Sequence, residues 1–103
     1  MKKQEQIGSI KVEWDIRKAQ LNVTKHGLSF DTASLVFADE HKVILYDFRH
    51  SLKEDRYIVI GLVHKLITVV YTEKHSSYRI ISARAATSKE RKLYYAENHQ
   101  KNC

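Results

Sequence analysis

Three arginines, Arg79, Arg84 and Arg91, fall within the short segment YRIISARAATSKERKLYY. Arginine suits phosphate binding because its planar guanidinium stays charged and can hold two oxygens at once. Metal-free phosphodiester cleavage in RNA needs such a cation on the extra phosphorus charge, and a group that takes the 2′ proton. Tyr94 and Tyr95 lie three and four residues after Arg91, so on a helix they share its surface and can stack on a base or pass a proton. The structural alternatives are packing of Tyr94 on a sheet and pairing of Arg91 with a carboxylate.

The direction of the first two arginines depends on the strand that carries them. Side chains alternate between the faces of a regular strand, so Arg79 and Arg84, an odd number apart, would lie on opposite faces. They converge on one phosphate only if the strand ends or bulges before Arg84. Because Ala85 and Ala86 lead into a helix start, an end there is the predicted arrangement.

A second candidate cluster is the segment RHSLKEDR, which contains His50, Glu54 and Arg56. Histidine titrates near neutral pH and is a natural proton carrier. Glu54 is either the general base or the partner that holds Arg56. The alternative for His50 is a loop residue with no role.

Further cations flank both clusters, and the charge is unevenly distributed. The net charge is +6; the chain from Lys74 onward holds seven Lys and Arg against two Asp and Glu, or +5. This excess favours an anionic partner such as nucleic acid, although it also serves solubility. Lys89 and Lys92 would attract RNA through their field, while Lys25 and His26 are assigned first to stabilising a helix end and second to contacting RNA.

The segments that must position these residues predict an α+β domain. SIKVEW alternates like a strand, Asp15 begins a helix from 16 to about 25, and Gly27 ends it. Ser29 begins a second helix that ends near Asp39. Four short runs rich in β-branched residues, KVILYDF, RYIVIGLV, LITVVYT and YRIISAR, predict an antiparallel meander.

The last predicted element is a helix that starts at the capping-box pattern TSKE, Thr87 to Glu90, and runs to about 98. Gly61 inside the second run predicts a bulge or a close approach, and HK after Val63 predicts a tight hairpin. The order is strand, helix, helix, four-stranded antiparallel meander and helix. One domain spans 1–103, with 1–8 and 99–103 as frayed ends.

Several function classes find no support in the sequence. No apolar run is long enough for a membrane span, and no apolar segment follows the N-terminal lysines to make a signal peptide. The single cysteine, Cys103, allows no internal disulfide, which favours a cytoplasmic location. The six histidines form no metal-binding spacing, and no phosphate-binding glycine loop is present, so we expect neither metal nor cofactor.

Three motifs, in this order and spacing, resemble the BrnT family of toxins from type II toxin–antitoxin systems: KHGLSF, HS..E.R...IG and RIISAR.A...ER..Y. The likeness extends from Val12 to Glu97. Ile16 stands where the family often has proline after EWD, and HK replaces a hairpin that often carries glycine. Neither departure touches the candidate site residues.

The resemblance implies a RelE-like ribonuclease that arrests translation by cleaving RNA. It also implies a BrnA-like ribbon-helix-helix antitoxin as partner, with operator DNA bound only through that antitoxin. The catalytic candidates are His50, Glu54, Arg56, Arg79, Arg84, Arg91 and Tyr94, and the RNA-binding candidates are Lys25, His26, Lys89, Lys92 and Tyr95. The competing hypothesis is a non-catalytic, basic nucleic-acid-binding module that acts within a complex.

Overall fold

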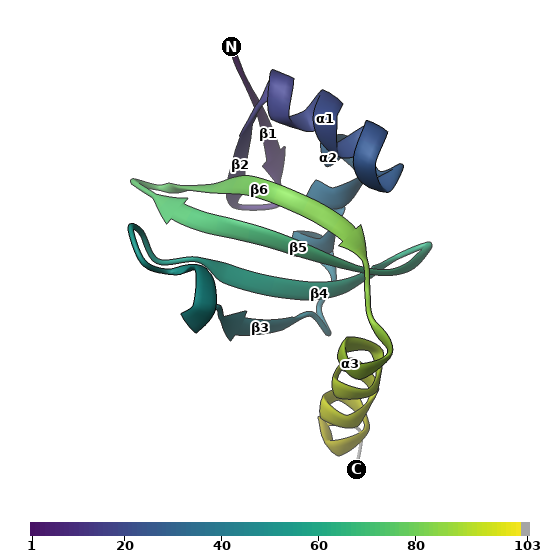
Figure 1. The fold of residues 1–103 in the computed structure, drawn as a ribbon. Coiled ribbons are helices and arrows are strands. Elements are labelled where there is room, and N and C mark those ends of the chain that lie inside the picture. The colour runs from purple at the N-terminus through teal and green to yellow at the C-terminus, as the bar shows by residue number, and fades with distance from the viewer. Residues whose placement is uncertain (102–103) are drawn as a thin grey trace.

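A twisted six-stranded sheet with helices on both of its faces forms the protein (Figure 1). The structure is a computed structural model that describes residues 1–101, with side chains through 98. The strands stand in the order β1-β2-β6-β5-β4-β3. Their bounds are β1 Lys2–Ile7, β2 Ile10–Asp15, β3 Val43–Tyr46, β4 Tyr57–Val63, β5 Lys65–Lys74 and β6 Ser77–Ala85. The helices are α1 Ile16–His26, α2 Phe30–Ala33 and α3 Ser88–Lys101, with 3-10 turns η1 Ser34–Ala38 and η2 Phe48–His50.

The α+β class is confirmed, but the predicted strand order was incomplete. Residues 2–7, predicted to be a frayed end, form β1, which pairs antiparallel with β2. The four predicted meander strands are only part of the sheet, because β2 adds to β6 in parallel through three residue pairs. The strand that the predicted RelE-like arrangement lacked is β1. At the other end, α3 continues through 101, and positions 102–103 of the second predicted frayed end lie outside the described residues.

Local capping signals placed the helix ends correctly. The Asp15 carboxylate accepts from the Lys18 N–H at 3.1 Å, and Gly27 adopts the left-handed φ of 68° that ends α1. At the start of α3, Thr87 and Glu90 exchange the two hydrogen bonds of a capping box, at 2.8 and 3.2 Å.

The second predicted helix was wrong in type over most of its length. Ser29 caps it as expected, but α-helical geometry ends at Ala33 and the tighter turn η1 follows. η1 lies against β4 so closely that a Cβ on Gly61 would sit 3.0 Å from the Val36 Cβ. Gly61 therefore marks a close approach, one of its two predicted roles, since β4 pairs with β5 without a shift there.

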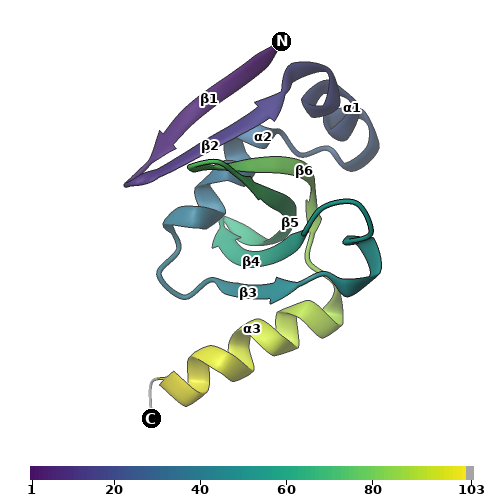
Figure 2. The same cartoon turned by 90° about the vertical axis from the view of Figure 1, so that its left-hand side faces the viewer.

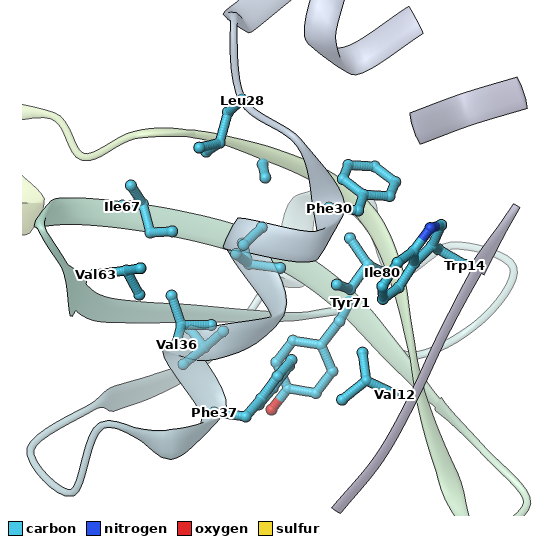
Figure 3. Packing of buried hydrophobic residues seen from close by; sticks show 14 residues of the cluster. Val12, Trp14, Leu28, Phe30, Val36, Phe37, Val63, Ile67, Tyr71 and Ile80 are labelled. Atoms are coloured by element: carbon cyan, nitrogen blue, oxygen red, sulfur yellow. The ribbon is translucent and has the colours of Figure 1, made fainter. Parts of the chain in front are cut away.

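One face of the sheet carries the main hydrophobic core (Figure 3). Trp14 from β2 meets Phe30 edge-on at 6.2 Å between ring centroids, and α2 and η1 cover the strands behind them. On the other face, Tyr94 of α3 packs with Ile60 and Leu66 at one end. Figures 1 and 2 show α3 at the end of the molecule far from α1. Part of this second face therefore stays open between the elements that flank it.

A bulge in β6 decides which way its arginines point. Tyr71 pairs with Ile80 and Val70 with Ser82, so Ile81 has no partner on β5. Ile80 and Ala83, three residues apart, are both fully buried in the same core. Arg79 and Arg84 therefore lie on the same, outer face, although β6 continues through Ala85 rather than ending before Arg84. The predicted strand end before Arg84 is therefore wrong, and the bulge, the other predicted possibility, puts both arginines on one face.

Candidate active site

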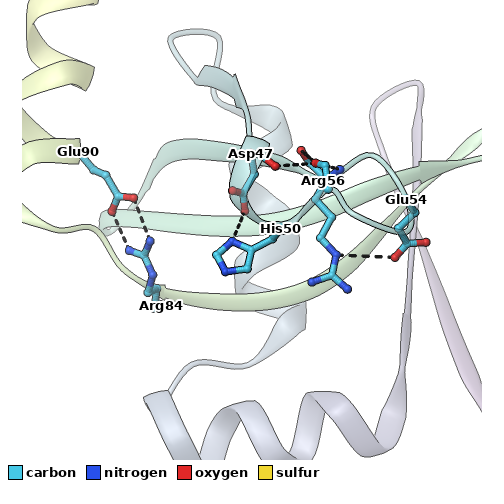
Figure 4. A network of polar contacts seen from close by, with 7 residues as sticks. Asp47, His50, Glu54, Arg56, Arg84 and Glu90 are labelled. Atoms are coloured by element: carbon cyan, nitrogen blue, oxygen red, sulfur yellow. Dashed lines mark hydrogen bonds and ion pairs between the residues drawn. The ribbon is translucent and has the colours of Figure 1, made fainter.

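The open part of the outer face holds a cleft between the loop after β3 and the end of β6 (Figure 4). Its volume of about 390 Å³ lies within the range of roughly 300–1,000 Å³ typical of ligand sites. Its floor is apolar and its walls are basic. The lining residues are Asp47, Arg49, His50, Arg56, Ile58, Val70, Ile81, Ser82 and Arg84.

Hydrogen bonds close the loop 47–56 at its base and so fix two of the cleft's side chains. The Asp47 N–H donates to the Arg56 carbonyl at 2.9 Å, which prolongs the pairing of β3 with β4. The Ser51 hydroxyl donates to the Asp47 carbonyl at 2.6 Å and accepts from the Arg56 N–H at 2.9 Å. Because Ser51 joins both ends, His50 and Arg56 are held near each other on one side of the loop (Figure 4).

An aspartate orients His50. The Asp47 carboxylate, 10% exposed, lies 2.9 Å from His50 Nδ1, while the His50 side chain is 65% exposed. A carboxylate at Nδ1 favours the tautomer with the proton on that nitrogen, which leaves Nε2 free to take a proton from a ligand. Asp47 was missed from the sequence; the signal that could have found it is its position three residues before His50, which a single helical turn brings together.

Arg56 has hydrogen-bonding capacity left for an anion. Its Nε is 3.8 Å from Glu54 Oε2, an ion pair that is too long for a hydrogen bond. Among the described residues, this buried Nε has no hydrogen-bond partner. This ion pair is the contact expected if Glu54 holds Arg56, which is one of the two roles predicted for Glu54. The Arg56 side chain is 34% exposed at the cleft, so an anion there would meet the terminal nitrogens of its guanidinium.

Arg84, in contrast, is engaged by a carboxylate. Its two terminal nitrogens donate to the two Glu90 oxygens at 2.7 and 3.0 Å (Figure 4). Burial alone would raise the pKa of the Glu90 carboxyl, but hydrogen bonds from Arg84, the Thr87 N–H and the Thr68 hydroxyl outweigh it and hold the pKa at about 2. The pair ties the end of β6 to the first turn of α3.

Three predicted catalytic residues lie outside the cleft. Arg79 lies opposite Glu13 in the parallel register of β2 and β6. The pKa of the Glu13 carboxyl is lowered by a hydrogen bond from Ser77, then by Lys2, and last by the charge of Arg79. Tyr94 is buried and donates to Asp39 at 2.7 Å. Arg91 is exposed on α3.

The predicted RNA-binding residues divide between two surfaces. Lys89, Lys92 and Tyr95 are exposed on α3. Lys25 and His26 line a second groove, beside α1, whose remaining walls are Lys18, Leu21, Asn22, Ile81 and Ser82.

Two further findings concern the described residues as a whole. Within them, no three His, Cys, Asp or Glu side chains are grouped so that they could hold a metal ion. None of the helices described is both long enough and apolar enough to cross a membrane.

The fold and the site together define a small, basic α+β protein with an oriented histidine and a partly exposed arginine at one cleft. Residues 14–90 match the family model described as "Ribonuclease toxin, BrnT, of type II toxin-antitoxin system". Because this match spans well over half of the chain, the chain belongs to the BrnT family of ribonuclease toxins, as its motifs predicted.

A solved structure supports the same assignment. The chain is similar to the crystal structure of the Brucella abortus ribonuclease toxin, BrnT, with 28% sequence identity and a TM-score of 0.57. The match covers 73% of this chain and 94% of the Brucella chain. No curated protein matches the sequence.

Proposed function

We propose that the cleft cleaves RNA without a metal ion, by attack of a 2′-hydroxyl on the adjacent phosphorus. The observation that carries this is the placing of the Asp47-oriented His50 beside Arg56 at one open cleft. Family membership supplies the ribonuclease activity; the mechanism rests on these side chains.

In this mechanism His50 is the general base. Neutral His50 takes the 2′ proton on Nε2 as the 2′ oxygen bonds to phosphorus, and the phosphorus–O5′ bond breaks. The products are a 2′,3′-cyclic phosphate and a 5′-hydroxyl, whose oxygen takes a proton from water in the open cleft. A positioned base of this kind contributes about 10²–10⁴ to the rate.

Arg56 stabilises the phosphorane through the terminal N–H groups of its partly exposed guanidinium, and Glu54 keeps that guanidinium in place. Arg84 forms the opposite wall, where Glu90 balances its charge and occupies its two terminal nitrogens. Arg79 and Arg91 lie outside the cleft and contribute only long-range attraction of the RNA in this mechanism, while Tyr94 contributes packing. Lys89, Lys92 and Tyr95 act at most on the approach of RNA.

The biological setting is proposed from the family. Cleavage would arrest translation in the cytoplasm, and a BrnA-like ribbon-helix-helix antitoxin would neutralise the toxin and bring it to operator DNA. Membership in a type II toxin–antitoxin family supports a protein antitoxin and an RNA substrate.

The test is cleavage of end-labelled RNA in EDTA by the purified chain. We expect new bands with cyclic-phosphate ends, a loss of about 10²–10⁴-fold in kcat for His50→Ala, and a smaller loss for Asp47→Asn. His75→Asn, in the exposed β5–β6 turn where φ is 58° and Asn is tolerated, is the matched control. Full activity of His50→Ala would refute the assignment of the base. RNA binding with no bands would identify the alternative, a non-catalytic nucleic-acid-binding module.

A further inference from the structure

The active-site cleft and the groove beside α1 share a wall. Ile81 and Ser82 line both, so the two hollows meet across the bulge of β6. Because Ile81 has no partner on β5, the regular pairing of β5 with β6 is interrupted where the cleft and the α1 groove adjoin. The two grooves therefore lie side by side along β6, and together we call them the path.

Asn22 fixes α1 against this edge. β2 pairs with β6 only as far as Arg79, which leaves the rest of that edge of β6 without a strand. The Asn22 amide fills the gap: it donates to the Ala83 carbonyl at 2.9 Å and accepts from the Ala83 N–H at 3.1 Å. It also donates to the Leu28 carbonyl at 2.9 Å, which ties the end of α1 to the same point. Helix α1, which carries Lys18 and Lys25, is thus held beside β6 (Figure 1).

The path is basic along its length. Lys18 and Lys25, with His26, line the α1 end, and no carboxylate lines that groove within the described residues. In the cleft, Asp47 is the one carboxylate among the described lining residues, and it is largely buried against His50. Among the described residues that line the α1 groove, the His26 imidazole is the one aromatic ring and no Phe, Tyr or Trp is present, so the groove offers chiefly charge for a backbone.

We propose that a single RNA strand runs from the α1 groove across the bulge of β6 into the cleft, held on the α1 side through its phosphates by Lys18 and Lys25. This proposal rests on the proposed function for the identity of the strand. Binding of the strand in the α1 groove is then independent of its sequence, and any base preference arises in the region of the cleft.

The test compares Lys18→Ala/Lys25→Ala with the parent in binding a fluorescent 2′-O-methyl oligoribonucleotide, which has no 2′-hydroxyl to react. Each phosphate contact on a single strand contributes about 0.7 to the slope of log K against log salt. Loss of two contacts should therefore make the slope less steep by about 1.4, by the same amount for oligonucleotides of different sequence. With cleavable RNA, KM should rise while kcat stays near that of the parent.

The matched control is Lys65→Ala/Lys74→Ala, which removes the same charge from exposed positions on β5 that line neither groove. A slope unchanged in the α1 variant, or changed equally in the control, would overturn the proposed path. Loss of antitoxin binding with RNA binding intact would assign the α1 groove to a protein partner instead. If the parent binds through Lys18 and Lys25 but does not cleave, the path stands and the proposed function fails.

Discussion

Replacement of Glu90 by Gln tests whether Arg84 is chiefly an anchor between β6 and α3. Gln has nearly the same size and still offers an oxygen to the Thr87 N–H, but it removes the charge that binds Arg84. The fall in the pKa of Glu90 from its ordinary 4.5 to about 2 corresponds to about 3.4 kcal/mol. Since the Arg84 side chain is 35% exposed, water screens part of this, and we expect a loss of about 2 kcal/mol in the free energy of unfolding.

The effect should depend on pH in a defined direction. The folded-state pKa lies below the unfolded one, so the contribution of the carboxylate is complete above about pH 4.5 and is lost as the pH falls toward about 2. The parent should therefore lose stability across this window relative to the variant. At neutral pH, a loss of 2 kcal/mol should lower the melting temperature by about 8–16 °C.

The measurement is urea denaturation followed by circular dichroism, at neutral pH and at several values below about pH 4.5. Glu97→Gln, an exposed carboxylate on the same helix, is the control and should change little. If the difference between parent and Glu90→Gln stays constant as the pH falls, the ion pair is not its source. If the variant remains folded at neutral pH but loses RNA cleavage, Arg84 does more than anchor α3.

Two more substitutions separate structural from catalytic roles. Tyr94→Phe removes a hydrogen bond to the Asp39 carboxylate, so we expect it to cost about 1.5–3 kcal/mol in urea denaturation and to leave RNA cleavage unchanged at neutral pH. A large loss of kcat in folded Tyr94→Phe would return the hydroxyl to the reaction. Asn22→Ala leaves the Ala83 N–H and carbonyl without their side-chain partner and should cost more than about 2 kcal/mol, whereas Leu21→Ala, at an exposed position beside it, should cost less than about 0.5 kcal/mol. Equal effects of the two substitutions would contradict the role given to the Asn22 amide.

The elements that the sequence predicted best are those fixed by neighbouring residues. Asp15, Gly27 and the Thr87–Glu90 pair each act within one turn of a helix, so their pattern is visible in a few letters. Strand β1 was missed because KKQEQI has no alternating apolar pattern and depends on its backbone pairing with β2.

The site was predicted less completely, because its key contacts join separate elements or depend on an irregular backbone. His50, Glu54, Arg56 and Arg84 could be named from residue types alone. The pairing of Arg84 with Glu90 crosses from a strand to a helix, and the sequence showed Glu90 only as a capping residue. No local pattern marks Ile81 as the bulged residue, because a bulge reflects the register between two strands rather than the composition of one.

The bulge also bears on how this sequence should be aligned with its relatives. A homologue with one residue fewer between the equivalents of Arg79 and Arg84 could keep both side chains on the outer face with a regular strand, because an even spacing would replace an odd one plus a bulge. An alignment that places the single-residue gap inside β6 would equate residues that point to the same face of the sheet. An alignment that moves the gap into the following loop would equate Arg84 with a residue that points to the opposite face. Alignments of this family that place such gaps only in loops would therefore equate residues that point in opposite directions.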